Sequence, residues 1–201
     1  MILAAARSVL VGAALALATG CASNAPPPAT QAPPPQDAHD YYPLAPQWRW
    51  AYEVEKNGER ILAIYAVKDV AGDTVIMEAG EERLLYAILP EGIARKEGLT
   101  VGDFILKTPV RVGTEWPVAG GKAKVTAVAQ TVTVPAGTFA NCAVVEEVRT
   151  NPDRVTRTTY AAGVGPVLVD YQVHDATAGR FETALRATLR GITRPGEDPL
   201  R

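Results

Sequence analysis

The sequence predicts an all-β protein with a strongly curved antiparallel meander sheet of about ten strands, in a half-barrel or clam-like form. Apolar and polar residues alternate over most of residues 41–195, the period of a half-buried strand. Short strand-like runs are separated at regular spacing by turns rich in Gly, Pro and Asn. Because such a sheet has one apolar face, it must curl over its own core.

The first strands follow from the alternation that begins at Trp48. Trp48, Trp50 and Tyr52 alternate with more polar neighbours, so we expect them on the inner face. Asn57-Gly58 is a strong hairpin signal, because both residue types tolerate positive φ. Residues 81–89 also suit a helical stripe, but Pro90-Glu91-Gly92 closes the run and we favour a strand.

The second half of the domain repeats this pattern. Strands over 122–134 and 139–150 are joined by Val134-Pro135-Ala136-Gly137, with Pro and Gly where a type I turn prefers them. Further strands are expected over 154–161 and 167–174. A last strand is expected to place alternate residues of the range 181–189 on one face.

Residues 1–20 have the features of a signal peptide. Arg7 is their one charge, an apolar stretch follows it, and small residues precede Cys21. The apolar run is shorter than the ~20 residues that a transmembrane helix needs. Cleavage after Gly20 would leave Cys21 as the first residue of the mature chain. The alternative is a plain secreted protein with a Cys at this position by chance.

Ala18-Thr19-Gly20-Cys21 resembles the bacterial lipobox, with Ala18 where Leu is commonest. The resemblance implies a thioether-linked diacylglycerol on Cys21 and an acyl chain such as palmitate on its amine. Two or three chains hold a protein firmly, at ~0.8 kcal/mol per buried CH₂. Because Ala22 is not Asp, the usual sorting rule implies, in a host with two membranes, the outer membrane, with the protein facing the periplasm.

Composition divides the mature chain into three parts. Residues 21–40 are the lipidated Cys and an Ala- and Pro-rich spacer without fixed structure, whose prolines favour an extended chain. Residues 41–195 form a single β domain, and 196–201 a flexible tail. Without Arg7, the 20 basic residues become 19 against 22 acidic ones, a net charge of −3. This near balance argues against a nucleic-acid partner.

Catalytic and metal-binding patterns are not found in the sequence of the domain. Both serines, Ser8 and Ser23, precede it, so a Ser-His-Asp site cannot form there. Cys142 alternates with apolar residues and is expected to be packed and inert rather than paired with His174. Asp170 and His174 share a strand face, which is typical of a solvated surface. We therefore expect a non-enzymatic protein with no catalytic residue, metal or cofactor beyond the lipid.

Three motifs resemble a family of bacterial envelope lipoproteins with no settled activity. They are Tyr41-Tyr42-Pro43-Leu44 with Trp48 downstream, Val134-Pro135-Ala136-Gly137-Thr138-Phe139, and Tyr160-Ala161-x-Gly163-Val164-Gly165. Pro46 stands where that family usually has a Gly. The resemblance spans most of residues 41–189. It implies a strongly curved all-β sheet and lends no catalytic residue.

The expected function is binding or interaction at the cell envelope. A concave face carrying Trp48, Trp50, Tyr52, Phe181 and Leu185 could cradle an apolar ligand such as an acyl chain, or an apolar segment of a partner. The same aromatic row could instead be core. An alternative function is a structural or assembly role, with the outer strand face or an edge contacting another envelope protein. An enzyme would need a pocket that gathers His174, Asp170 and a further acid.

Overall fold

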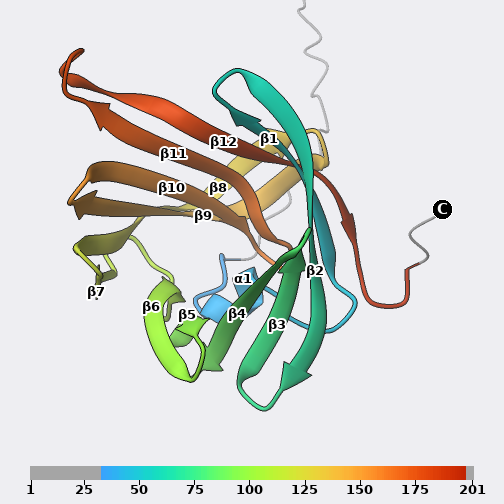
Figure 1. The fold of residues 1–201 in the computed structure, drawn as a ribbon. Coiled ribbons are helices and arrows are strands. Elements are labelled where there is room, and N and C mark those ends of the chain that lie inside the picture. Colours follow the sequence, from blue (N-terminus) through green and yellow to red (C-terminus); the bar gives the residue numbers. More distant parts are fainter. Residues whose placement is uncertain (1–32, 198–201) are drawn as a thin grey trace, which may run out of the picture. The chain divides into compact units, whose positions relative to one another are not determined.

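The computed structural model describes residues 33–197 and confirms the curved all-β meander. Twelve strands, where about ten were expected, form one sheet of antiparallel neighbours after a four-residue helix (Figure 1). Predictions on residues 1–32 and 198–201, including Cys21, lie outside the described residues. The elements are α1 (Ala38–Tyr41), β1 (Arg49–Lys56), β2 (Glu59–Ala71), β3 (Thr74–Ala79), β4 (Glu82–Leu89), β5 (Gly92–Glu97), β6 (Thr100–Lys107), β7 (Glu115–Val118), β8 (Gly121–Val134), β9 (Gly137–Thr150), β10 (Asp153–Ala161), β11 (Gly165–Asp175) and β12 (Arg180–Thr193).

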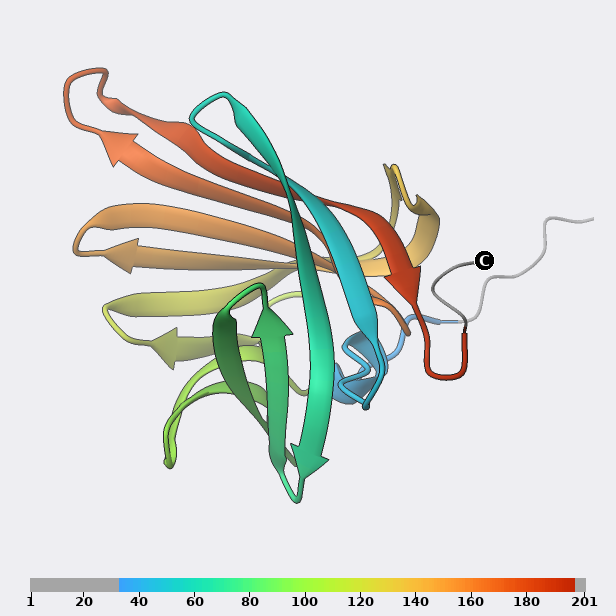
Figure 2. The same cartoon turned by 45° about the vertical axis from the view of Figure 1, so that its right-hand side comes forward.

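The order of the strands explains the strong curvature of the sheet. It runs β6-β5-β4-β3-β2-β1-β12-β11-β10-β9-β8-β7, so consecutive strands β6 and β7 occupy opposite edges. In a flat sheet, eleven spacings of ~4.8 Å would separate these edges by ~53 Å. The eight steps from Lys107 to Glu115 reach at most ~28 Å. The sheet must therefore curl until its edges approach each other, as Figures 1 and 2 show.

Side chains join the two edges of the curled sheet. Trp116 on β7 donates its indole N–H to the backbone oxygen of Phe104 on β6, at 2.9 Å. The Asp103 carboxylate of β6 accepts from the backbone N–H of Ala119 and from the Arg149 guanidinium, each at 2.9 Å. We call this set of contacts the seam. It replaces a ladder of backbone hydrogen bonds between β6 and β7, which are not paired strands.

The hairpins confirm the turn predictions. Lys56 pairs with Glu59 across Asn57-Gly58, whose φ angles of 52° and 80° are those of a type I′ turn. Val134 pairs with Gly137, which leaves Pro135 and Ala136 as a two-residue turn. Residues 82–89 form a strand, as favoured over a helix.

The segment before β1 fills one end of the curved sheet. The Asp37 carboxylate caps α1 by accepting from the His39 backbone N–H at 3.0 Å, and Ala38 and Tyr41 are fully buried. The backbone N–H of Val110 donates to Gln36 at 2.7 Å. Residues 36–40, which the sequence assigns to the spacer, therefore lie in the folded body. Within residues 33–197, no helix has the length and hydropathy needed to cross a membrane.

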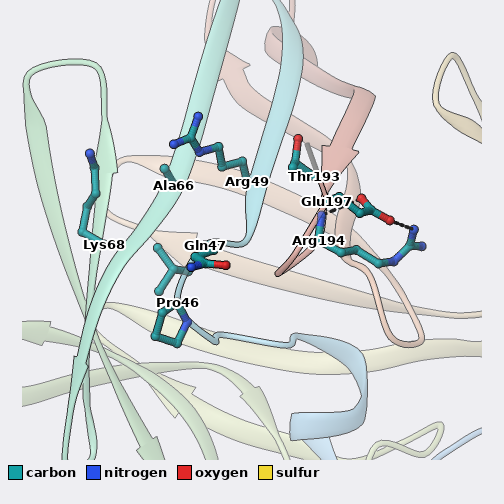
Figure 3. A pocket seen from close by; sticks show the side chains of 9 residues that line it. Pro46, Gln47, Arg49, Ala66, Lys68, Thr193, Arg194 and Glu197 are labelled. Atoms are coloured by element: carbon teal, nitrogen blue, oxygen red, sulfur yellow. Dashed lines mark hydrogen bonds and ion pairs between the residues drawn. The ribbon is translucent and has the colours of Figure 1, made fainter. Parts of the chain in front are cut away.

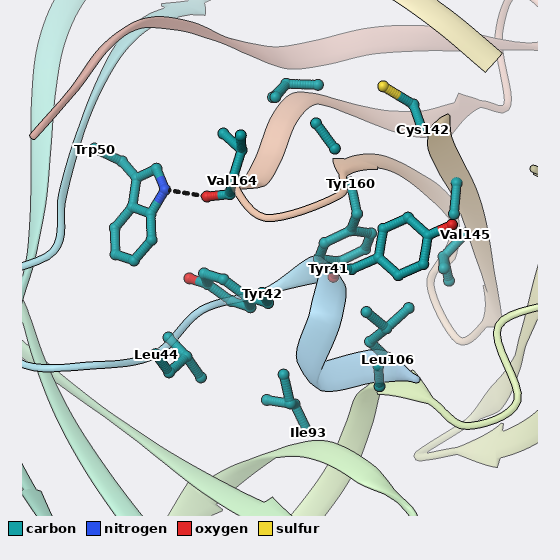
Figure 4. Packing of buried hydrophobic residues seen from close by; sticks show 14 of the residues in the cluster. Tyr41, Tyr42, Leu44, Trp50, Ile93, Leu106, Cys142, Val145, Tyr160 and Val164 are labelled. Atoms are coloured by element: carbon teal, nitrogen blue, oxygen red, sulfur yellow. Dashed lines mark hydrogen bonds between the residues drawn. The ribbon is translucent and has the colours of Figure 1, made fainter. Parts of the chain in front are cut away.

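The motifs around Tyr42 and Gly165 meet in the core (Figure 4). Trp50 donates its indole N–H to Val164, in the turn between β10 and β11, at 2.6 Å. Gly165 has a φ of 107°, and a Cβ there would lie 2.9 Å from a Tyr42 ring carbon and 3.2 Å from the Trp50 indole nitrogen. This close approach explains why a glycine occupies the position.

Candidate ligand pocket

The predicted aromatic row is mainly core. Trp50 and Tyr52 are on the inner face of β1, Trp48 directly precedes this strand, and all three are buried. The two indole rings stack with centroids 5.5 Å apart. The Tyr52 hydroxyl donates to the backbone oxygen of Pro166 at 2.7 Å. Trp48 and Trp50 do not line the pocket described below, whereas Tyr52 forms part of its wall.

The expectation that Phe181 and Leu185 share one face of β12 is wrong. Tyr171 pairs with Leu185, but its neighbour Gln172 pairs with Thr183, so one residue of β12 bulges out of the ladder. Such a bulge moves the side chains beyond it to the other face. Leu185 packs against the core. Phe181 is 43% exposed and meets His174 edge-on, with ring centroids 5.3 Å apart.

A tyrosine-lined pocket of about 200 Å³ opens on the inner face of the sheet. It gathers five of the seven tyrosines of the chain, together with small apolar residues, two threonines and one arginine. The lining residues are Tyr42, Tyr52, Tyr65, Tyr86, Arg95, Ile105, Thr156, Thr158, Tyr160, Pro166, Val169 and Ala187. At ~30 Å³ per water molecule, this volume corresponds to about seven waters.

Strands from both halves of the sheet place the tyrosine rings. Tyr52 on β1 and Tyr65 on β2 meet edge-on, with ring centroids 5.5 Å apart. Tyr42 follows α1. Its ring centroid is 6.3 Å from that of Tyr86 on β4 and 6.2 Å from that of Tyr160 on β10. These separations suit the edge-to-face and tilted contacts that aromatic rings prefer. Tyr42, Tyr52 and Tyr160 are buried and form the floor.

The hydroxyls of the pocket divide into two groups. Tyr52 donates to Pro166, Tyr160 donates to the backbone oxygen of Ile105 at 3.3 Å, and Tyr42 contacts the Met77 sulfur at 3.9 Å. Tyr65 and Tyr86 are only partly buried, and their hydroxyls hydrogen-bond to no other residue in the range 33–197. These two phenols are therefore free to contact a ligand.

Burial keeps the phenols of the pocket neutral. It raises the pKa of Tyr42 and Tyr52 well above the usual value of 10.0. Burial also raises the pKa of Tyr86 and Tyr160. The positive charge of Arg95 lowers these two pKa values, but the effect of burial is larger. Each phenol can therefore donate a proton in a hydrogen bond at neutral pH.

Arg95 supplies the one charge among the lining residues. It is exposed on β5, directly opposite Tyr86 on β4. It lines the same pocket as Tyr86 and Tyr160. No salt bridge to Arg95 forms within residues 33–197. Arg95 is therefore the one charged residue of the lining, and Glu82, whose charge adds to the effect of burial in raising the pKa of Tyr65, is outside that lining.

A larger concavity on the opposite side of β1 and β2 has a different character. It measures about 470 Å³ and is lined by residues such as Arg49, Lys68 and Arg194 (Figure 3). Arg194 pairs with Glu197 at 3.4 Å, and Lys68 pairs with Glu78 at 2.9 Å. Its charges are exposed and largely partnered within the chain, so we consider the tyrosine-lined pocket the better candidate.

The remaining residues weighed for chemistry lie apart from the pocket lining. Burial raises the pKa of the Cys142 thiol, which donates to the backbone oxygen of Phe139 at 3.4 Å. Asp170 forms an ion pair with Arg186 at 2.6 Å. Among residues 33–197, no three His, Cys, Asp or Glu side chains gather as metal ligands would.

The sequence carries a signal for the pocket that periodicity alone does not single out. Tyr52, Tyr65 and Tyr86 are on strands at inward positions, where an apolar residue is the usual choice. Several tyrosines at inward positions indicate a partly wet interior. Arg95 would not be found this way, because a charged residue on a short strand is typical of an outer face.

No protein-family model and no curated protein sequence matches this chain. The fold is similar to a Bacteroides fragilis structure described as an exported protein with a YmcC-like fold. That match has 9% identity and a TM-score of 0.48, and covers 77% of this chain and 99% of the other. A Parabacteroides distasonis structure described as a lipoprotein matches at 12% identity and a TM-score of 0.40, covering 79% and 100%. These likenesses concern the fold alone.

Proposed function

We propose that this protein is a lipid-anchored binding protein of the bacterial envelope, which holds a small ligand in the tyrosine-lined pocket without transforming it. The observation that carries the proposal is the pocket itself, where five aromatic rings surround an opening on the inner face of the sheet. Pockets with an apolar body and a few placed polar groups are the usual form of small-molecule sites.

The size of the pocket limits the ligand. The segment before β1 fills the interior beside it, with Tyr41, Tyr42 and Leu44 buried in the core (Figure 4). A space of about 200 Å³ suits a ring-sized group or the end of an acyl chain rather than a whole chain. The ligand is therefore small, or it buries only one end.

The chemistry of the lining supports binding rather than catalysis. None of its twelve residues is an Asp, Glu, His, Cys, Ser or Lys, the side chains that most often act as nucleophiles or general bases. The phenols have pKa values raised by burial, which makes them poor bases at neutral pH. What the site offers is shape, ring faces and hydrogen-bond donors.

Native mass spectrometry of the detergent-solubilised full chain tests the pocket. We expect a bound small molecule in the wild type and its loss in Ala187→Phe, which fills the space. Thr188→Phe adds the same ring to the opposite face of β12 and is the matched control. Retention of the bound mass by Ala187→Phe, with both variants folded, would contradict the proposal.

The membrane anchor is proposed from Cys21 and tested separately. Cys21→Ser should abolish labelling by a palmitate analogue and release the protein from the membrane fraction. Ala22→Asp should move the labelled protein from the outer to the inner membrane on a density gradient. A wild-type protein that is unlabelled and freely diffusing would exclude the anchor.

A second candidate function, an assembly role, is supported by the edge of β2. Residues 59–64 pair with β1, but β3 pairs with β2 only from Tyr65 onwards. Ile61, Leu62 and Ile64 are 60%, 64% and 51% exposed on this stretch. An edge with apolar side chains and no second strand neighbour within residues 33–197 could accept an extended segment of another envelope protein.

Photo-crosslinking in cells tests the assembly role. A crosslinkable phenylalanine at Leu62 should give one product with one envelope protein, and Ile64→Lys should reduce its yield. Val112 is similarly exposed, at 59%, and serves as the control position. Equal products from both positions would argue against a specific edge.

A further inference from the structure

We propose that the ligand of the tyrosine-lined pocket carries a carboxylate, which Arg95 binds at the mouth while a flat, ring-sized body lies among the tyrosines. This inference rests on the proposed binding function and names the class of ligand. It follows from three features of the pocket: the position of its one charge, the hydrogen-bonding groups at its mouth, and its shape.

The first feature is the position of Arg95. It lines the pocket and is cross-strand from Tyr86, so the guanidinium is beside the opening rather than on an unrelated surface. No acidic residue shares the lining. A planar guanidinium matches a carboxylate with two parallel N–H···O bonds, which gives both affinity and orientation.

The second feature is an excess of donors at the mouth. Arg95 brings only N–H donors, and the unpartnered hydroxyls of Tyr65 and Tyr86 can donate beside it. Both phenols are protonated at neutral pH, since burial raises the pKa of each above 10.0, with a further upward effect of the Glu82 carboxylate on Tyr65. Three donor side chains without a lining carboxylate favour an anion that accepts several hydrogen bonds over a cation or a neutral amide.

The third feature is the shape of the interior. Tyr52 and Tyr65 meet edge-on, and the faces of neighbouring rings border a space of about 200 Å³. Aromatic walls favour a flat group that can stack or meet them edge-on. An aromatic acid would fit the rings and the charge together.

Isothermal titration of the full chain in detergent micelles, with benzoate and its neutral isostere benzamide, tests this inference. We expect benzoate to bind more tightly than benzamide. Arg95→Gln should weaken benzoate roughly ten- to a hundredfold, the range for a hydrogen-bonded charge, and leave benzamide unchanged. Arg83→Gln removes an exposed charge outside the pocket, on β4, and should change neither.

The possible outcomes distinguish a failure of the carboxylate inference from a failure of the proposed binding function. Equal binding of benzoate and benzamide, both lost in Ala187→Phe, would overturn the carboxylate and keep the pocket. Failure of both probes to bind at millimolar concentration, together with no bound mass in the native spectrum, would overturn both. Benzoate binding that survives Arg95→Gln would overturn the role of Arg95.

Discussion

At the scale of single residues, the core depends on hydrogen bonds from large aromatic side chains to the backbone where β11 begins. Trp50 donates to Val164 in the turn before β11 and Tyr52 donates to Pro166 on β11, so two rings from one strand satisfy the backbone oxygens on either side of Gly165. Gly165 sits between these acceptors. The motif around Gly163 and Gly165 is thereby explained by packing rather than by chemistry.

Gly165→Ala should destabilise the protein more than Gly163→Ala. Both glycines have positive φ, but a Cβ at Gly163 meets open space, whereas one at Gly165 meets Tyr42 and Trp50. We expect about 1 kcal/mol for Gly163→Ala from backbone strain alone. Gly165→Ala should cost about 3 kcal/mol, because overpacking adds to strain. Urea unfolding followed by tryptophan fluorescence measures the loss of unfolding free energy in each variant. Equal losses would contradict the close packing of Tyr42 and Trp50 against Gly165.

Stability should fall at alkaline pH. Burial raises the pKa of Tyr42, Tyr52, Tyr86 and Tyr160, so the folded protein keeps protons that the unfolded chain releases near pH ~10. The stabilising contribution is complete below pH ~10 and is lost as pH rises further, by up to ~1.4 kcal/mol per tyrosine per pH unit.

Urea midpoints measured from pH ~8 to ~11 test this dependence around the ordinary tyrosine pKa. Tyr52→Phe should make the alkaline decline less steep, because it removes one of the retained protons. Tyrosinate absorbance measures ionisation directly. If it shows that every tyrosine ionises near pH ~10 while the protein is still folded, the prediction is contradicted.

At the scale of elements, the seam closes the sheet with few contacts. The side chains of Asp103 and Arg149 are only 25% and 16% exposed, so this ion pair is partly shielded from water. Arg149 also pairs with Glu147 at 2.5 Å. Removing Asp103 would leave the Ala119 N–H without its acceptor.

Asp103→Ala should therefore loosen the seam before the rest of the sheet. We expect about 1–3 kcal/mol of destabilisation from the lost partner of a partly buried charge. Hydrogen exchange should quicken in β6 and β7 while β9 to β11 stay protected. Lys122→Gln breaks the exposed pair with Glu115 nearby and should cost under ~0.5 kcal/mol. Uniform exchange across the sheet would contradict a local seam.

The strands that could be predicted from the sequence are those with long alternation and a turn of known chemistry. The hairpin at Asn57-Gly58 and the pair joined at Pro135-Ala136 are of this kind. β5 was not evident, because Gly92–Glu97 is short and ends in three charged residues. The bulge in β12 could not be foreseen either, since one extra residue leaves no mark on composition. Because of this bulge, alternation alone wrongly predicts Phe181 on the inner face.

At the scale of the whole molecule, the segment from Gln36 to Trp48 is part of the fold. Composition could not show this, because residues 36–40 continue a polar, proline-rich stretch. Their role depends on contacts made far along the chain, such as the hydrogen bond from Ala38 to Thr108. The pocket likewise combines residues from β1, β2, β4, β5, β6, β10, β11 and β12, whose meeting depends on the curling of the sheet.

Deleting residues 22–32 should leave thermal stability nearly unchanged, because the proline-rich composition there predicts a spacer. Deleting residues 22–46 should unfold the domain, since it removes the buried Tyr41, Tyr42 and Leu44. Losses of several kcal/mol are typical for each large buried side chain. Circular dichroism during heating distinguishes the two variants. A stable domain after the longer deletion would contradict the packing role.

The position of β1 beside β12 has a consequence for how the chain folds. Ten of the eleven strand pairings join strands that follow one another in sequence, and only β1–β12 joins distant segments. Local hairpins form within microseconds, whereas closing a loop of more than a hundred residues carries a larger entropic cost. We expect refolding to be limited by the meeting of two preformed halves. Ile192→Val, in the part of β12 that pairs with β1 and not with β11, should therefore change the refolding rate more than matched changes within either half, as stopped-flow fluorescence would show.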